Sequence, residues 1–391
     1  MRNAAATPIA RASGSKGGRA AAPYRLMVVD DSAVIRGLLT RSLEADPEVE
    51  VLASASNGEM ALSALSRHDI EIVILDIEMP VMDGLTALPK LLAAKPGLKV
   101  IIASTLTRRG ADISMKALAA GAADYLTKPG ASALTSADQF KQELLRKVKA
   151  LGQARRRAVG LAAPQPAARG AAEPAFEPAH DAHEAQRRVI ALRLGAREVP
   201  EIVAIGSSTG GPQALFHVTS ALKGAVKQPI FITQHMPATF TTILAEHLAR
   251  ASGYPAAEGV DGEPVRGGRI YVAPGDFHMT VQAERGEKVV RLTKTPPENF
   301  CRPSVDPMLR SLAAAYGARV LTLILTGMGH DGLAGGRAVV EAGGTVIAQD
   351  EASSVVWGMP GSVAMAGLCS AVLPLDEIGP FVGKLAMRAG R

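Results

Sequence analysis

A serine lies in a glycine-rich turn near the middle of the chain, directly after a short apolar run. The segment Gly206-Ser207-Ser208-Thr209-Gly210 fits the pattern G-x-S-x-G and follows the apolar residues 202–205. Such a turn at the end of a strand exposes the hydroxyl of Ser208, which can then attack a carbonyl carbon. Gly210 and Gly211 add room for a substrate backbone and free amides for an anion. A tight strand–helix turn with no chemistry shows the same residues, so the motif alone leaves both interpretations open.

A serine nucleophile requires a base, and His235 is the best-placed candidate. It lies in Gln234-His235-Met236-Pro237, directly after the apolar run 230–233. In a parallel sheet this position shares an edge with Ser208, because the carboxyl ends of parallel strands meet there. His278, at the start of another predicted strand, is a weaker alternative. A lone histidine often has a structural role, so the argument depends on the serine turn at the matching strand end.

The base requires an acid that orients it, and Asp331 is the candidate. It follows the apolar run 320–325 through the turn Thr326-Gly327-Met328-Gly329 and opens a predicted helix. An aspartate there could also act as a helix N-cap, and the two roles are compatible. The backbone N–H of Met328 in the same turn could donate to the oxyanion that forms when a carbonyl is attacked.

A second constellation lies in the first third of the chain, where polar residues follow predicted parallel strands. Three carboxylates in one pocket repel one another unless a hard cation such as Mg²⁺ binds between them. With a phosphate oriented by the cation, a carboxylate nucleophile can form an aspartyl phosphate. Each residue alone also fits a solvated loop, but their matching positions favour one shared site. The positions are Asp30, Asp31, Asp76, Ser104 and Lys128.

The elements that position these residues form two regions of alternating apolar runs and helical patterns. Such alternation predicts α/β domains with parallel sheets and ligands at the carboxyl ends of the strands. The first region, 24–150, predicts a five-stranded doubly wound domain, and the second, 200–391, predicts another α/β domain with a mostly parallel sheet. The expected strands are 26–29, 49–53, 70–75, 100–103 and 125–126, then 202–205, 229–233, 269–273, 320–325 and 345–348, with an antiparallel hairpin over 278–292.

Composition narrows the class of protein. A chain of 391 residues can hold two domains of ordinary size, and residues 1–23 and 151–199, rich in Ala and Arg, predict a disordered tail and a linker. The two cysteines cannot form a disulfide framework, which fits a reducing, cytoplasmic setting. No apolar run is long enough to insert into a membrane. The net charge of +6 lies largely in the expected tail and linker, so nucleic acid is not an expected partner.

The motifs of the first region resemble those of response-regulator receiver domains, over nearly all of 24–150. The motifs are Asp30-Asp31-Ser32, Leu75-Asp76-Ile77-Glu78-Met79-Pro80, Met82-Asp83-Gly84 and Lys128-Pro129. The resemblance implies a two-component phosphoprotein in which a sensor histidine kinase supplies the phosphoryl group. It further implies that Asp76 is the phosphoacceptor, that Asp31, Asp76 and the carbonyl of Glu78 bind Mg²⁺ with Asp30 acting through water, that Ser104 and Tyr125 form the switch pair, and that Lys128 contacts the phosphoryl group.

The motifs of the second region are similar to those of the chemotaxis methylesterases, which are also protein-glutamine deamidases. Four motifs lie in order across 202–378: Ser208-Thr209-Gly210-Gly211, Gln234-His235-Met236-Pro237, Arg302-Pro303-Ser304-Val305-Asp306 and Thr326-Gly327-Met328-Gly329-His330-Asp331-Gly332. The order Ser, His, Asp differs from that of the α/β-hydrolases. The resemblance implies that Ser208 is the nucleophile, His235 the base and Asp331 the orienting acid, with Thr209 holding His235 and Met328 supplying the oxyanion amide. Two departures from the family are His330, where asparagine is frequent, and Cys301, where histidine is frequent.

Together the two regions predict a phosphorylation-activated serine esterase that removes methyl groups from glutamates of chemotaxis receptors, giving sensory adaptation. Ester hydrolysis of this kind needs no cofactor, whereas phosphorylation needs Mg²⁺. The linker also allows the unphosphorylated receiver to cover the catalytic edge. Two alternatives stay open. One is a non-enzymatic response regulator, although residues 200–391 show no recognition-helix pattern. The other is an esterase with a different substrate.

Overall fold

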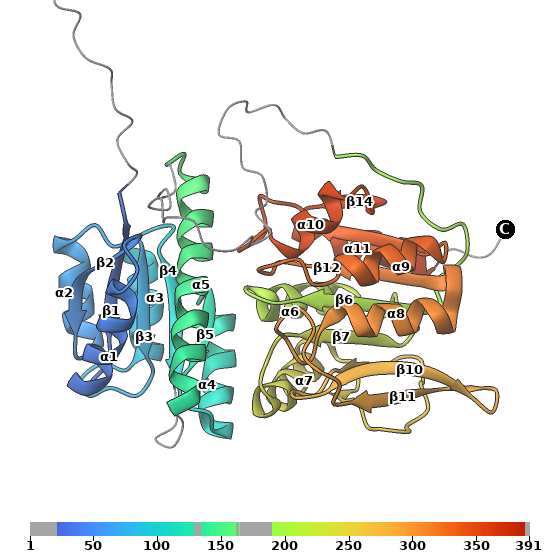
Figure 1. The fold of residues 1–391 in the computed structure, drawn as a ribbon, viewed down its shortest axis with the longest axis horizontal. Coiled ribbons are helices and arrows are strands. Elements are labelled where there is room, and N and C mark those ends of the chain that lie inside the picture. The colour runs from blue at the N-terminus through green and yellow to red at the C-terminus, as the bar shows by residue number, and fades with distance from the viewer. Residues whose placement is uncertain (1–21, 129–133, 162–163, 165–189, 388–391) are drawn as a thin grey trace, which may run out of the picture.

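The two predicted α/β regions fold into two domains, each with its own parallel sheet, that lie side by side (Figure 1). The computed structural model describes residues 22–128, 134–161, 164 and 190–387, so almost all of the expected tail, 1–23, lies outside the described residues. The fold class expected from the sequence is confirmed in both domains. No helix within the described ranges is long and apolar enough to cross a membrane.

The first domain is a parallel sheet of five strands in the order β2-β1-β3-β4-β5. The central strand β3 is buried along its whole length, since helices cover both faces of a doubly wound sheet. The strands are β1 (Tyr24–Val29), β2 (Val49–Ala55), β3 (Ile72–Asp76), β4 (Lys99–Ser104) and β5 (Asp124–Thr127). The helices are α1 (Ala33–Glu44), α2 (Gly58–Arg67), α3 (Gly84–Ala94), α4 (Arg108–Ala119) and α5 (Leu134–Ala158).

Helix α5 continues to Ala158, into the segment that the sequence predicted to be linker. Its last turns are tied to the first domain by Glu71, whose side chain is completely buried. Arg156 donates to both carboxylate oxygens of Glu71, at 2.8 and 2.7 Å, and Arg155 donates at 3.1 Å. Burial would raise the pKa of Glu71, but hydrogen bonds from Arg156 and the Arg25 backbone outweigh it and lower that pKa. Arg155 and Arg156, which the sequence placed in the linker, are therefore buried parts of the first domain.

The second domain is a seven-stranded parallel sheet in the order β14-β13-β12-β6-β7-β9-β8, with a separate antiparallel hairpin of β10 and β11. All five expected strands and the hairpin are confirmed. The strands are β6 (Ile202–Ser207), β7 (Ile230–Gln234), β8 (Ala256–Glu258), β9 (Ile270–Val272), β10 (His278–Glu284), β11 (Glu287–Thr293), β12 (Val320–Ile324), β13 (Thr345–Gln349) and β14 (Ala371–Leu373). The helices are α6 (Gly211–Ala221), α7 (Ala238–Ser252), α8 (Val305–Tyr316), η1 (Gly317–Arg319), α9 (Leu333–Glu341), α10 (Met359–Met365) and α11 (Leu375–Ala386).

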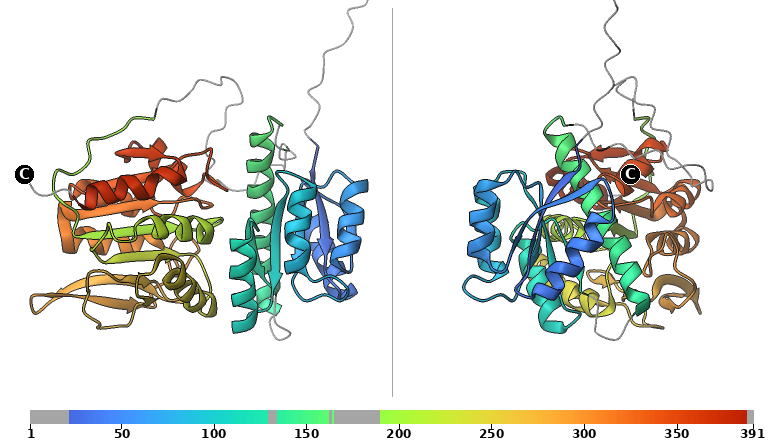
Figure 2. Two further views of the ribbon diagram at one scale, coloured as in Figure 1. Left: turned by 180° about the vertical axis from the view of Figure 1, so that it is seen from behind. Right: turned by 60° about the vertical axis from the view of Figure 1, so that its left-hand side comes forward.

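Helix α4 of the first domain packs against α6 and α7, the helices that follow β6 and β7 in the second domain (Figure 2). Tyr125 stacks on Phe240 of α7 with ring centroids 4.6 Å apart. Asp112 and His247 are paired at 2.9 Å. Because α6 and α7 begin at the carboxyl edge of the sheet, this interface lies beside the strand ends that carry the candidate catalytic residues.

Candidate active site

The three candidate catalytic residues follow three neighbouring strands of the larger sheet. Ser208 comes directly after β6, His235 directly after β7, and Asp331 follows β12 through a glycine-rich turn. Strand β6 lies between β7 and β12. Parallel strands end at one edge, so the fold brings the three residues to one place although the sequence separates them.

The serine turn is held by hydrogen bonds of its backbone, and it contains two positions, 210 and 211, that favour glycine. The Ser208 N–H donates to Thr326 O at 3.0 Å, and the Ser208 carbonyl accepts from Gln234 Nε2 at 3.0 Å. Gly210 has φ = 76°, in the left-handed region that favours glycine. A Cβ on Gly211 would lie 1.9 Å from Gln234 Oε1. Gly210 is thus favoured by its left-handed backbone, and Gly211 by the Gln234 side chain at the end of β7.

His235 and Asp331 form the central pair of the site. His235 Nε2 lies 2.7 Å from Asp331 Oδ2, and the Asp331 side chain is only 1% exposed. The carboxylate also accepts hydrogen bonds from Ser304 Oγ at 2.8 Å and from the Val305 N–H at 2.7 Å. Burial would raise the pKa of Asp331, but the hydrogen bond with His235 and these further donors lower it to about 2. Asp331 is therefore a fixed anion that orients the imidazole.

The sequence did not predict two further contacts of this pair. Cys301 lies beside the His235 ring, close enough to influence the pKa of the imidazole. Burial would lower the pKa of His235, but Cys301 and Asp331 beside the ring raise it to about 10. Asn299 donates from Nδ2 to Asp331 Oδ1 at 2.9 Å. Asn299 lies just before the Arg-Pro-Ser-Val-Asp motif, but the neighbouring sequence does not indicate this contact. With Nε2 engaged by Asp331, Nδ1 is the ring nitrogen left to exchange a proton with a nucleophile.

Neither the Ser208 hydroxyl nor the Thr209 hydroxyl is hydrogen-bonded to His235 among the described residues of this structure. In the part of the chain that the structure describes, Ser208 Oγ makes no hydrogen bond to the His235 ring. Catalytic hydrogen bonds often tighten only when substrate is bound. The Thr209 hydroxyl, expected to hold His235, instead donates to Asp124 Oδ2 of the first domain at 2.9 Å. In this arrangement a buried carboxylate from the other domain accepts from the hydroxyl, and the role of Thr209 in holding His235 stays a prediction.

The turn that carries Met328 faces both the site and the first domain. Among the described residues, the Met328 N–H has no hydrogen-bond acceptor, as an oxyanion donor requires. Its side chain packs, together with Val355, against a hydrophobic cluster formed mainly by first-domain residues. His330 is exposed at the same turn. The proposed oxyanion donor therefore lies at the domain interface.

The acidic pocket of the first domain gathers the residues that the sequence placed there. Oxygens of Asp30, Asp31 and Asp76 all lie within 4.8 Å of one another. Lys128 Nζ is 2.7 Å from Asp30 Oδ2 and 2.7 Å from Asp76 Oδ1. Burial raises the pKa of Asp76, although Lys128 opposes the shift. One ammonium cannot neutralise three carboxylates, so this oxygen-only donor set fits a hard divalent cation.

The other receiver residues expected from the sequence lie at the end of β4, on β5 and after β3. Ser104 is buried at the end of β4, where its backbone carbonyl accepts from the Lys128 N–H at 2.7 Å. Tyr125 is buried against the second domain and has a pKa well above its usual value because of that burial. The Glu78 side chain is paired with Arg109 at 3.3 Å, and both side chains are exposed.

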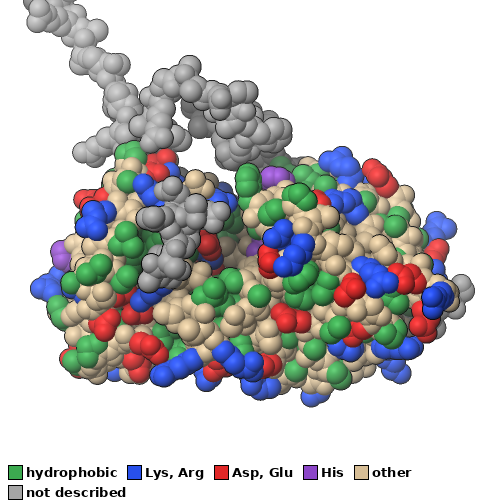
Figure 3. All heavy atoms as spheres, turned by 60° about the horizontal axis from the view of Figure 1, so that its bottom comes forward, with side chains coloured by type: hydrophobic (Ala, Val, Ile, Leu, Met, Phe, Trp, Pro, Cys, Tyr) green, Lys and Arg blue, Asp and Glu red, His purple; other side chains and the backbone are tan. Residues whose placement is uncertain are grey.

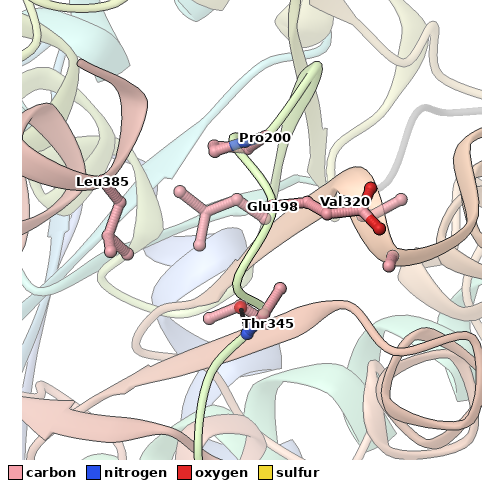
Figure 4. Close-up of a pocket in the computed structure, with 8 residues that line it drawn as sticks. Glu198, Pro200, Val320, Thr345 and Leu385 are labelled. Carbon is pink, nitrogen blue, oxygen red and sulfur yellow. Dashed lines mark hydrogen bonds between the residues drawn. The ribbon is translucent and has the colours of Figure 1, made fainter. Parts of the chain in front are cut away.

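The small cavity drawn in Figure 4 lies at the opposite edge of the larger sheet. Its lining includes Val320 and Thr345, the first residues of β12 and β13, and its volume of about 10 Å³ is water-sized at most. A wider hollow of about 420 Å³ lies at the domain junction, lined by Arg108 of α4 and Ala238 of α7. Only the second of these is next to the candidate catalytic edge.

The fold and the two sites define a response regulator whose output domain is a hydrolase. Residues 26–137 match the family model for the response regulator receiver domain, and residues 203–382 match the model for CheB methylesterase. The protein-glutamate methylesterase/protein-glutamine glutaminase 1 of Paramagnetospirillum magneticum is 61% identical over 372 residues, covering 93% of this chain and 96% of that protein. The corresponding enzyme of Azospirillum brasilense is 59% identical, covering 98% and 97%. This chain belongs to the protein-glutamate methylesterase/protein-glutamine glutaminase family.

A solved structure overlaps the second domain. The crystal structure of the CheB methylesterase catalytic domain of Thermotoga maritima is 42% identical, with a TM-score of 0.47, and covers 48% of this chain and 98% of that chain.

Proposed function

We propose that this protein is a phosphorylation-activated serine esterase that hydrolyses glutamate methyl esters on chemotaxis receptors and deamidates receptor glutamines. The observation that carries the proposal is the His235–Asp331 pair, 2.7 Å apart, at a strand edge shared with Ser208. The activity named in close relatives supports the substrate class. The face in Figure 3 mixes Lys and Arg with Asp and Glu, without the single basic patch that a nucleic-acid partner would need.

The proposed reaction uses three groups. Ser208 Oγ attacks the side-chain carbonyl carbon of the methylated glutamate, and its proton passes to Nδ1 of His235. The Met328 N–H donates to the oxyanion, and Asp331 stabilises the imidazolium. The C–O bond breaks, His235 returns the proton, and methanol leaves. Water then loses a proton to His235 and attacks the acyl-enzyme, which releases the glutamate carboxylate and restores Ser208. With glutamine as substrate, ammonia leaves in place of methanol.

The receiver pocket would accept a phosphoryl group on Asp76 from a sensor histidine kinase. Asp31, Asp76 and the Glu78 carbonyl would hold Mg²⁺, with Asp30 acting through water. The cation would neutralise the phosphoryl oxygens during transfer. Lys128, now paired with Asp30 and Asp76, would move its ammonium to a phosphoryl oxygen. Ser104 would donate to another.

The domain interface supports control of the esterase by the receiver. Asp124 holds Thr209, the neighbour of Ser208, and the switch residue Tyr125 stacks on Phe240, which follows the His235 loop. We expect phosphorylation to draw Ser104 inward, move Tyr125 and loosen this interface. A tenfold gain in activity needs a differential stabilisation of only about 1.4 kcal/mol.

The test is release of radiolabelled methanol from methylated receptor membranes by the full chain, with and without a small phosphodonor. The proposal expects release that the phosphodonor stimulates and that Ser208→Ala abolishes. A chain that takes up phosphate on Asp76 but releases no methanol would instead be a non-enzymatic regulator. Release from other esters but not from receptors would favour the esterase with a different substrate.

A further inference from the structure

A two-residue turn between β11 and α8 carries an exposed aromatic side chain beside the catalytic pair. Glu298 and Cys301 exchange backbone hydrogen bonds at 3.1 and 2.9 Å, which closes the turn around Asn299 and Phe300. The Phe300 side chain is 89% exposed. It is therefore a large apolar group held in solvent, close to residues that contact the reacting groups.

The backbone conformation of this turn is strained for a phenylalanine. Asn299 has φ = 52° and Phe300 has φ = 62°, so both lie in the left-handed region. Turns with two such residues favour asparagine followed by glycine, because glycine has no Cβ to clash. Asn299 fits this preference, whereas Phe300 stands where glycine would be least strained. A bulky residue kept in a strained, exposed position indicates a use for its side chain.

Both neighbours of Phe300 fix the turn to the catalytic pair. Asn299 Nδ2 donates to Asp331 Oδ1 and to Asp306 Oδ2, each at 2.9 Å. Cys301 lies beside the His235 ring and raises the pKa of the imidazole. The start of the turn is held as well, because Arg310 donates to both carboxylate oxygens of Glu298, at 2.6 and 2.8 Å. Phe300 is thus presented outward from a rigid base whose inner face is the acid–base pair.

We propose that Phe300 is a specificity-determining residue that contacts the apolar side of the substrate helix next to the esterified glutamate. This inference rests on the proposed function, which supplies a helix as substrate. On a helix, residues three and four positions from the glutamate lie on its own face, within reach of a side chain beside the site. An aromatic ring provides a large apolar contact there with few torsions to immobilise.

The receiver reaches the same side chain. The Arg146 guanidinium of α5 lies 5.9 Å from the centre of the Phe300 ring, at the outer limit of a cation–π contact. Arg146 is itself exposed, so this contact is weak and easily exchanged for a substrate. Phe300 therefore lies between the catalytic pair and helix α5 of the first domain, on the side from which we expect a substrate helix to approach.

The experiment measures methanol release by the phosphorylated full chain as a function of the concentration of methylated receptor membranes. Phe300→Gly is the informative variant, because glycine accepts the positive φ and the fold loses no stability. We expect KM to rise about tenfold, kcat to stay within twofold, and Tm to stay equal or rise. Phe300→Tyr should keep the parent KM. Val260→Ala, which trims a 60% exposed side chain in the loop after β8, is the matched control and should match the parent.

Two results would overturn the inference. An unchanged KM in Phe300→Gly would remove Phe300 from substrate recognition, and a fall in kcat alone would mean that the turn serves only to hold His235 and Asp331. Co-sedimentation of the Ser208→Ala chain with the same membranes, with and without Phe300→Gly, tests the contact without turnover. If the parent releases no methanol, the proposed function fails, while co-sedimentation still decides whether Phe300 binds the receptor.

Discussion

Thr209 and Asp124 are joined by a buried hydrogen bond of 2.9 Å, although they belong to different domains. Thr209 follows the candidate nucleophile, and Asp124 precedes the candidate switch residue Tyr125. Asp124 is also paired with Lys147 of α5 at 3.1 Å. One carboxylate thus joins strand β5, helix α5 and the serine turn across the domain interface.

Replacing Asp124 by alanine should raise the basal activity of the unphosphorylated chain. Loss of one buried hydrogen bond worth about 1 kcal/mol corresponds to a rise of about fivefold in initial rate. Arg108→Ala, which breaks an exposed ion pair with Glu246 at the same interface, should change the rate much less. The rates are measured without phosphodonor, and Tm reports whether losing the Lys147 partner unfolds the receiver. A folded Asp124→Ala chain with unchanged basal activity would show that this bond does not restrain the site.

Removing any member of the catalytic set should abolish ester hydrolysis, with losses that do not add. Ser208→Ala should leave the fold intact, because the turn is held by backbone contacts. Asp331→Asn should lose on the order of 10⁴-fold in kcat if the analogy with serine proteases holds. Because the groups act as a unit, a variant that combines both changes should have a kcat no lower than that of the less active single variant. Substantial turnover by Ser208→Ala would remove the nucleophile assignment.

The pH dependence of hydrolysis should depend on Cys301. The pKa of His235 is raised to about 10, and the base must be neutral to accept the serine proton, so the rate should rise with pH towards that value. Cys301→Ser removes one group that favours the imidazolium, which lowers the pKa of His235 and moves the acid limb of the profile to lower pH. Cys369→Ala, at the buried second cysteine, is the control and should leave the profile in place. Identical profiles for parent and Cys301→Ser would show that the thiol does not influence the base.

Phosphorylation should depend on the acidic pocket alone. Asp76→Asn should prevent phosphoryl uptake and leave basal methanol release measurable, because the pocket is separate from the esterase edge. Asp31→Asn should weaken Mg²⁺ binding, since it removes one of three converging carboxylates. Both can be followed by incorporation of labelled phosphate and by Mg²⁺ titration of the full chain. Stimulation by phosphodonor in Asp76→Asn would place the acceptor elsewhere.

Sequence pattern alone predicted the two α/β domains, the five principal strands of each sheet and the edges at which the candidate residues meet. In parallel α/β domains the position of a residue after an apolar run already fixes its place in space. The pattern missed β8 and β14, because neither of these short strands is buried throughout, unlike the equally short β9. It also missed the end of α5, where buried Glu71 makes arginines part of the core.

The residues that adjust the site were decided by the tertiary structure. Asn299 and Cys301 reach the catalytic pair only because a turn from another part of the chain packs against it. Thr209 has Asp124 as its partner only because the receiver lies against the serine turn. Local sequence specifies which groups end a strand, since backbone propensity and apolar periodicity are local. Which group each of them finds across an interface depends on packing between elements distant in sequence.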